Sequence, residues 1–260
     1  MATTTTTKPD GPAAQLTAEV LALIKKAKTV ELKLTIPEDS YRSTALALGL
    51  DPLEAQIRQV IFFDTPDLAL NAAGVVVRAR RSQGGADDTV IKLRPVDPDD
   101  LPPKLRKLPE FGIEVDAMPG GGTVCSASFK GELKRNHVRA TALGERPIGK
   151  LFTKGQRRFY EAHAPEGLDI DSLSILGPLN VLKLKTYPKA FGQRLVVELW
   201  LYPDGSRVLE LSTKCRPAEA VQVATESRAF MNDRGIDLTG EQATKTASAL
   251  NFFAAELRDA

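Results

Sequence analysis

Apolar and charged residues alternate along several short segments of the chain. In the stretch TVELKLTI, Val30, Leu32 and Leu34 fall on one parity. Glu31 and Lys33 fall on the other. Successive side chains of a β-strand point to opposite faces of its sheet, so this alternation predicts a strand with one apolar and one charged face. The same kind of pattern predicts strands at residues 29–36, 56–64, 74–81, 88–94, 111–118, 181–186, 194–202 and 207–214.

A second periodicity, with apolar residues three or four positions apart, predicts helices around these strands. Such a stripe is present in residues 15–28, 217–235 and 239–257. Residues 126–163 are expected to be mostly helical and to form an inserted lobe. Within this lobe the basic stretch KGQRRFY is either a lip over a binding site or a solvated helix face, and the second interpretation is favoured.

The length of 260 residues suits one domain with both kinds of element. Residues 16–260 are expected to form this domain, and residues 1–15 a disordered tail. Runs of strands followed by helices are typical of an α+β fold.

The charged faces of the predicted strands are uniform in composition. Over seven strands they consist almost wholly of Arg, Lys, Glu and Asp. One interpretation is the solvated face of an open antiparallel sheet, where runs of charge usually lie. The other is a closed barrel with this face inward, so that cations and carboxylates line a water-filled lumen. The uniformity favours the barrel, with helices packed outside on the apolar face.

The stretch VVVRARR shows what such a lumen is suited to bind. Arg78 and Arg80 lie two residues apart, so they point the same way and repel each other. A phosphate chain between them would turn repulsion into attraction, because guanidinium and ammonium groups bind phosphate oxygens. Carboxylates in the same lumen would hold hard cations such as Mg²⁺ or Mn²⁺.

The composition excludes some other classes of function. A formal net charge of +2 does not support wholesale nucleic-acid binding, so any positive field must be local. No apolar run is long enough to span a bilayer, and the first residues do not resemble a secretory signal. We therefore expect a cytoplasmic protein with no nucleic-acid or membrane partner. Cys125 and Cys215 lack metal-ligand spacing and are expected to be free structural thiols.

Four blocks of the sequence resemble one known family. They are VELK, FFDTPDLALNAAGVVVRARR, TVIKLRP and TKTASALNFF. The chain resembles the CYTH superfamily, or triphosphate tunnel metalloenzymes, whose members share an ExExK signature and an FDTPD segment followed by an arginine pair. The resemblance implies an antiparallel eight-stranded barrel that binds a triphosphate. Members of the family are tripolyphosphatases, thiamine or nucleoside triphosphatases, RNA triphosphatases, or class IV adenylate cyclases.

The resemblance also implies roles for the charged residues. It assigns catalytic roles to Glu31, as a metal ligand, and to Lys33, which would position the triphosphate or activate water. The implied phosphate-binding residues are Arg78, Arg80, Lys92, Arg94, Lys183, Lys185 and Lys214. The implied metal-binding residues are Glu31, Glu114, Asp116, Glu198 and Glu210, with Mg²⁺ or Mn²⁺ as the cofactor.

Two positions depart from the family pattern. Thr29 stands where ExExK begins with glutamate, and Ser212 stands where a second carboxylate commonly follows Glu210. A hydroxyl is a weaker ligand for hard cations than a carboxylate, so one metal position should be weakened or moved. Two outcomes are open: the tunnel binds polyphosphate but turns it over poorly, or Asp116 compensates for the missing carboxylates.

The predicted function is a divalent-metal-dependent hydrolase of a small molecule that contains a triphosphate. An adenylate cyclase of the same fold is one alternative, because it differs only in the oxygen that attacks phosphorus. A non-catalytic module that binds polyphosphate, nucleotides or phosphorylated proteins is the other, and the hydroxyls of Thr29 and Ser212 support it.

Overall fold

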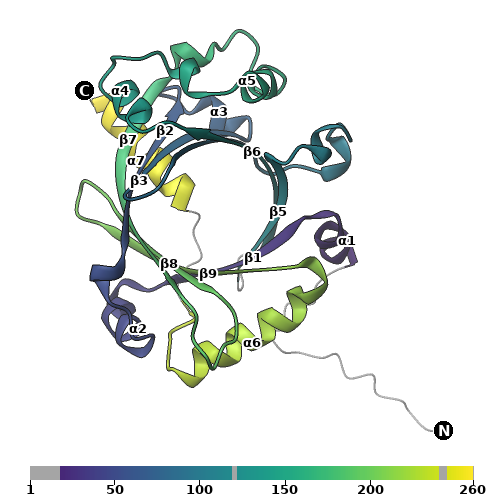
Figure 1. Ribbon diagram of the computed structural model, residues 1–260, viewed down its shortest axis with the longest axis vertical. Helices are drawn as coiled ribbons and strands as arrows, with labels where there is room; N and C mark the ends of the chain where they lie inside the picture. The colour runs from purple at the N-terminus through teal and green to yellow at the C-terminus, as the bar shows by residue number, and fades with distance from the viewer. Residues whose placement is uncertain (1–17, 119–121, 240–244, 260) are drawn as a thin grey trace, which may run out of the picture.

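The centre of the molecule is a single β-sheet that closes on itself (Figure 1). The computed structural model describes residues 18–118, 122–239 and 245–259, so the expected tail at residues 1–15 lies outside the described residues. In spatial order the strands are β1-β5-β6-β4-β3-β2-β7-β8-β9. Their bounds are β1 Thr29–Ile36, β2 Gln56–Asp64, β3 Val75–Ser82, β4 Asp87–Leu93, β5 Phe111–Met118, β6 Gly122–Leu133, β7 Ser174–Thr186, β8 Leu195–Leu201 and β9 Arg207–Cys215.

The α+β barrel is as predicted, but its strand count and strand directions differ. The barrel has nine strands rather than eight. β1 pairs with β9 in antiparallel fashion and with β5 in parallel fashion. A closed ring with an odd number of strands cannot alternate in direction throughout, so at least one parallel pair is required. The β1–β5 pair supplies it.

The extra strand is β6, which lies where the sequence predicts helix. The prediction of a helical segment over residues 126–163 is therefore wrong for residues 126–133. In β6, Cys125, Ala127 and Phe129 are buried in the apolar core, while Ser126 and Ser128 face the other way. Small residues have weak strand preference and hide the alternation. The rest of the insertion does contain helices, α4 His137–Ala142 and α5 Lys154–Glu161.

β7 begins earlier than predicted, at Ser174 rather than at residue 181. Gly177 and Pro178 interrupt its sequence pattern, and such residues usually end a strand. Here the pairing of β7 with β2 shifts in register between Val60 and Phe62. A bulge of this kind accommodates a proline within a paired strand.

The apolar face of most strands points outward and is covered by helices. α1 (Ala18–Lys26) and the insertion contribute Ile24 and Phe159 to a core that includes Val30 and Ile113. α6 (Ala220–Asp233) packs Phe230 and Met231 over the outer side of β8 and β9. These helices lie outside the barrel, as predicted.

α5 carries the KGQRRFY stretch on the outside of the barrel. Its Phe159 and Tyr160 are buried, and the buried Gln156 donates a hydrogen bond to the Phe129 carbonyl of β6 (3.1 Å). Lys154 and Arg158 are exposed. The basic residues thus form a solvated helix face, the interpretation favoured from the sequence.

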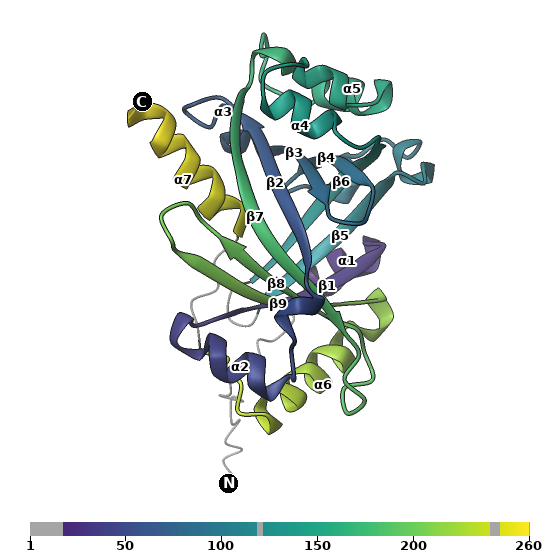
Figure 2. The ribbon, with the colours of Figure 1, turned by 60° about the vertical axis from the view of Figure 1, so that its left-hand side comes forward.

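α7 (Lys245–Asp259) differs from the other helices, because it covers one end of the barrel interior. Its Leu250 and Phe253 pack in one cluster with Phe62, Val181 and Trp200, which belong to the inward face. In Figure 1, α7 begins within the outline of the ring and runs past β7 to the C-terminus outside it, and Figure 2 shows it beside β7 at one end of the barrel. The expectation that both C-terminal helices pack outside is therefore wrong for α7.

Two further α-helices are short, α2 (Tyr41–Ala47) and α3 (Ala69–Ala72). Across the described ranges, no helix is both long and apolar enough to cross a membrane. Cys125 and Cys215 are free and buried, as expected.

Candidate active site

Cross-strand register places the charged faces of the strands together on the inside of the barrel. Lys33 lies opposite Ser212, and Glu198 lies opposite Glu210. Opposed residues of paired strands point to the same face, so these side chains share the lumen. The predicted site residues on this face are Glu31, Lys33, Arg78, Arg80, Lys92, Arg94, Glu114, Asp116, Lys183, Lys185, Glu198, Glu210 and Lys214.

Asp116 is the centre of the first group of lumen charges. Its side chain has 0% exposure, and one of its oxygens lies 3.1 Å from the Lys33 Nζ. The other oxygen lies 3.4 Å from Arg94 Nη1 and 3.7 Å from Lys92 Nζ. β1 pairs directly with β5, and β4 is separated from β5 by β6, so the contacts from Lys92 and Arg94 extend over the inner face of β6. Burial alone would raise the pKa of Asp116, but the three cations lower it.

The pKa values of the two lysines near Asp116 are shifted in opposite directions. Burial acts to lower the pKa of Lys33, but Glu31, Asp116 and Glu210 outweigh it and raise that pKa above its ordinary value. Burial lowers the pKa of Lys92 to about 8, because Asp116 offsets only part of the desolvation. Lys33 therefore stays charged at neutral pH, whereas Lys92 titrates near it.

A second group surrounds Lys245, at the first residue of α7. Its Nζ lies 2.6 Å from a carboxylate oxygen of Glu198 and 2.6 Å from one of Glu210, and over the Trp200 ring at 4.9 Å. Glu198 also pairs with Lys183 at 2.8 Å. Burial opposes ionisation of Glu198, but the two lysines hold its pKa well below the ordinary value. The pKa of Glu210 is raised, chiefly by burial.

A third group lies where β1, β5 and β9 meet. The Lys214 Nζ is 2.6 Å from an oxygen of Glu114 and 3.7 Å from one of Glu31. The hydroxyl of Thr29 donates to the same Glu114 oxygen at 3.4 Å. Burial opposes the charge on Lys214, but Glu31 and Glu114 raise its pKa. Thr29 is thus part of an ion-pair cluster.

The arginine pair on β3 has two different environments. Arg80 forms a charge-assisted pair with Asp88 of β4 at 2.9 Å. The Arg78 side chain is half-buried, and its Nε is shielded from solvent with no hydrogen-bond partner among the described residues. Burial, and then the nearby Arg80, lower the pKa of Arg78 to about 10. A buried guanidinium without full compensation is costly, so the lumen is prepared for an anion beside Arg78.

The lumen has one closed and one open end. α7 covers the end near Phe62 and Trp200. At the other end, a cavity of about 150 Å³ is lined by residues that include Thr29, Glu114 and Lys130. Lys185 is exposed at this end of β7. These lysines place positive charge at the end of the lumen opposite to α7.

Comparison with known proteins identifies the architecture. No protein-family model matches the sequence, and no curated protein matches it. The structure is similar to a candidate adenylyl cyclase from Hippeastrum with a dominant triphosphatase activity, with a TM-score of 0.62 and 18% identity. The match covers 85% of this chain and 94% of that one. A candidate adenylate cyclase from Bacillus halodurans matches with a TM-score of 0.57 and 9% identity, over 85% and 98% of the chains.

The chain has a CYTH-like triphosphate tunnel fold. The lumen described above is the tunnel of this fold. At these identities the similarity concerns the fold alone, so the chemistry rests on the side chains of this chain.

Several charged tunnel residues were not predicted from the sequence, among them Arg58, Asp88 and Lys245. Arg58 and Asp88 lie on the inward faces of β2 and β4. The alternation of QIRQV would have identified Arg58, since it points with Gln56 and Val60. Lys245 has no such signal, because it belongs to a helix whose position in the tunnel depends on tertiary packing.

The tunnel carboxylates do not assemble into a metal site of the predicted kind. Among the described residues, no group of three or more His, Cys, Asp and Glu side chains is placed to hold a metal ion. Glu210 lies opposite Thr35, four residues along β1 from Glu31. The backbone positions of the two glutamates are therefore offset by roughly 13 Å along the strand. The residues present therefore do not fit a protein cage for Mg²⁺ or Mn²⁺. That cofactor stays a prediction from the resemblance, and no chemical step is assigned to it.

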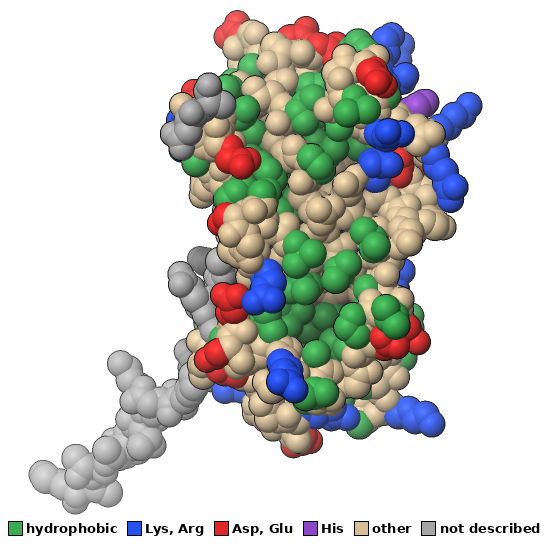
Figure 3. Space-filling model, turned by 90° about the vertical axis from the view of Figure 1, so that its left-hand side faces the viewer, with side chains coloured by type: hydrophobic (Ala, Val, Ile, Leu, Met, Phe, Trp, Pro, Cys, Tyr) green, Lys and Arg blue, Asp and Glu red, His purple; other side chains and the backbone are tan. Residues whose placement is uncertain are grey.

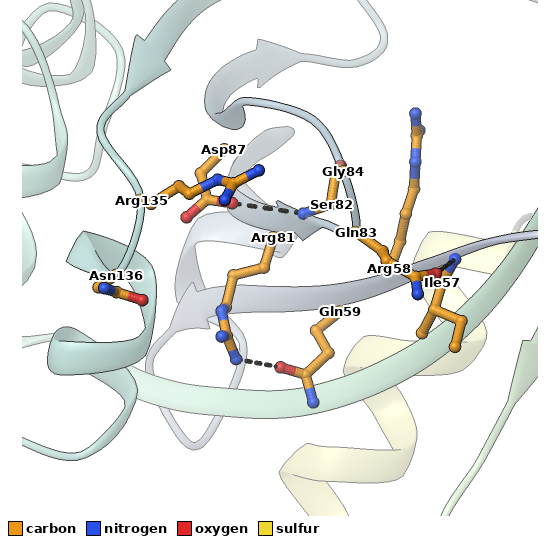
Figure 4. Close-up of a pocket in the computed structure, with 10 residues that line it drawn as sticks. All are labelled: Ile57, Arg58, Gln59, Arg81, Ser82, Gln83, Gly84, Asp87, Arg135 and Asn136. Atoms are coloured by element: carbon orange, nitrogen blue, oxygen red, sulfur yellow. Dashed lines mark hydrogen bonds between the residues drawn. The ribbon is translucent and has the colours of Figure 1, made fainter.

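A separate cavity of about 380 Å³ lies outside the tunnel (Figure 4). Arg81 donates there to Gln59 at 2.6 Å, and Figure 4 shows Arg58 pointing away from this pair. None of the predicted site residues lines it. Figure 3 shows a face of the exterior with apolar side chains across its middle and charged ones mainly toward its edges. The convergence of predicted residues is thus a property of the tunnel.

Proposed function

We propose that the protein is a hydrolase that binds the triphosphate of inorganic tripolyphosphate, or of a nucleoside or thiamine triphosphate, in its tunnel. The observation that carries this proposal is the half-buried Arg78, whose buried Nε lacks a partner among the described residues. It faces a lumen that also contains Arg80, Lys92 and Lys183. A triphosphate has the length and charge to engage several of these cations at once.

The tunnel residues would divide the work of hydrolysis. Arg78, Arg80 and Lys92 bind phosphate oxygens and neutralise charge as the bond to the leaving phosphate breaks. Lys33 stays protonated because Glu31 and Asp116 raise its pKa, so it positions the phosphates and does not accept a proton.

The attacking water must lose a proton to a basic group. Glu210 is suited to accept it, because burial raises the pKa of this carboxylate above its ordinary value. Water would attack a terminal phosphorus in line with the bridging oxygen that leaves. The products are then inorganic phosphate and the shortened phosphate chain.

The test is a phosphate-release screen of tripolyphosphate, ATP, GTP and thiamine triphosphate, with Mg²⁺, with Mn²⁺ and with EDTA. We expect release from at least one substrate, and its loss in Arg78→Ala. An adenylate cyclase would instead form cyclic AMP and pyrophosphate from ATP. If no substrate releases phosphate although tripolyphosphate binds, the hydrolase proposal is wrong.

Binding without turnover is the second candidate function. Thr29 and Ser212 favour it, because they occupy positions where the resembled family carries carboxylates. The same screen separates the candidates when titration calorimetry accompanies it, since a binding module gives heat of binding but no phosphate.

A further inference from the structure

Two lysines of the tunnel each lie between two carboxylates. The Lys245 Nζ is 2.6 Å from Glu198 and 2.6 Å from Glu210. The Lys214 Nζ is 2.6 Å from Glu114 and 3.7 Å from Glu31. An ammonium group in this position does what a bridging metal ion does, because it neutralises two oxygen ligands from different strands.

Every carboxylate that the resemblance assigns to metal has a lysine within ion-pair distance. Lys214 and Lys245 account for four of them, and Asp116 pairs with Lys33 at 3.1 Å. The hydroxyls of Thr29 and Ser212 meanwhile lower the number of anionic ligands. The chain thus has hydroxyls at two positions where the resembled family carries carboxylates, and its remaining tunnel carboxylates are paired with lysines.

Binding of a divalent ion at these carboxylates is energetically unfavourable. The side chains of Lys245 and Glu210 are only 10% and 7% exposed. A metal bound to Glu198 and Glu210 would have to displace the Lys245 ammonium and leave it buried beside a second positive ion. Removing one partner of a buried ion pair is strongly destabilising, so displacement opposes metal binding.

We propose that Lys214 and Lys245 act as resident cations in place of a divalent metal, so that the tunnel binds the metal-free triphosphate anion. This inference rests on the proposed function, because it concerns the form in which the same tunnel takes its triphosphate. Fixed ammonium groups, together with Arg78 and Lys92, then supply the positive charge that a metal would bring with the substrate.

Calorimetric titration with sodium tripolyphosphate tests the proposal directly. In EDTA we expect full binding, and added Mg²⁺ should weaken it because the metal competes for the free anion. Binding that requires Mg²⁺ would overturn the inference and leave the proposed function standing. No binding under either condition would overturn both.

Direct Mn²⁺ binding, followed by electron paramagnetic resonance without triphosphate, gives a readout independent of activity. The wild-type protein should bind Mn²⁺ weakly. Lys214→Ala should remove the ammonium group that bridges Glu31 and Glu114, which leaves Lys33 beside Glu31, and tighten Mn²⁺ binding by about tenfold or more. Lys245→Met should do the same at Glu198 and Glu210 while it keeps an apolar stem over Trp200.

Lys130→Ala is the matched control. Its Nζ is exposed and lies at the 4.0 Å limit from Glu114, so it does not bridge two carboxylates. This variant should bind Mn²⁺ as the wild type does. If the wild type binds Mn²⁺ as tightly as Lys214→Ala and Lys245→Met, the lysines do not replace a metal and the proposal is wrong.

Discussion

Arg78 is a tunnel residue whose charge is not fully compensated, since its side chain is half-buried and its buried Nε has no hydrogen-bond partner among the described residues. Replacing it with alanine should weaken tripolyphosphate binding by about 1.5–3 kcal/mol, the scale of a hydrogen bond to a charged group. The free energy of unfolding should stay the same or increase, because a buried, repelled charge is removed. Titration calorimetry and denaturant unfolding measure the two effects.

Arg81→Ala is the control for Arg78→Ala, because Arg81 pairs with Gln59 outside the tunnel. It should leave tripolyphosphate affinity unchanged. Equal affinities for wild type and Arg78→Ala would mean that Arg78 does not contact the phosphate chain.

Lys92 should make binding depend on pH near neutrality. Burial lowers its pKa to about 8, so the lysine loses its charge as the pH rises through this value. Tripolyphosphate affinity should therefore fall between pH 7 and 9 by up to about tenfold. The unfolded chain keeps its proton up to the ordinary pKa of 10.5, so the Lys92 contribution to stability rises from about pH 8 to pH 10.5.

Lys92→Arg separates this effect from the titration of tripolyphosphate itself. Arginine stays charged over the whole range. The ratio of the two affinities should change between pH 7 and 9, since only the wild type loses a cation. A constant ratio would show that Lys92 titrates elsewhere or does not bind phosphate.

Alternation along the strands is enough to predict most of the tunnel residues. It places Arg78 and Arg80 together, and the same rule identifies Arg58. The ion-pair partner of each charged side chain cannot be predicted from this alternation. Asp116 contacts cations from β1 and β4, and those distances depend on barrel closure, which is not encoded in any one strand.

Among the elements, α7 contributes both to the apolar cluster at one end of the barrel and to the candidate active site. Phe253 is buried among inward-facing residues of β2, β7 and β8, and Lys245 lies two turns earlier on the same helix. Phe253→Ala should lower the free energy of unfolding by about 3–5 kcal/mol, as for other buried aromatic truncations. Chemical denaturation measures the loss.

Leu257→Ala tests whether this loss reflects burial in the tunnel end. Leu257 lies on the same helix but is 38% exposed, so its truncation should cost much less. Similar losses for both variants would mean that α7 contributes by helix formation and not by closing the barrel.

Elements with strong alternation are predicted well from the sequence, and those without it are not. β1, β2 and β5 have the predicted bounds. β6 was not predicted because the small side chains of its Ser126–Ser128 segment fit a helix as well as a strand. The first half of β7 was not predicted because the bulge opposite Gly177 and Pro178 depends on the partner strand β2.

At the scale of the whole molecule, an anion in the tunnel should hold the barrel together. Cations outnumber carboxylates among the predicted tunnel residues, so their mutual repulsion opposes folding. Tripolyphosphate at a hundred times its Kd should stabilise the protein by about 2.7 kcal/mol. A thermal melt should show a higher Tm with tripolyphosphate, and a smaller rise for Arg78→Ala.

Sodium chloride at equal ionic strength is the control for this melt. It screens surface charges in the same way but has no triphosphate to span the lumen. A Tm that rises equally with both salts would contradict specific binding.

The barrel closes where β1 pairs with β5 on one side and with β9 on the other. Both partners are synthesised long after β1, and β9 is the last strand to be made. Until then β1 keeps an unpaired edge, and such edges pair readily with other chains. Correct folding during synthesis therefore depends on protection of the β1 edge until β9 has left the ribosome. Chaperones or contacts with other parts of the chain can provide this protection.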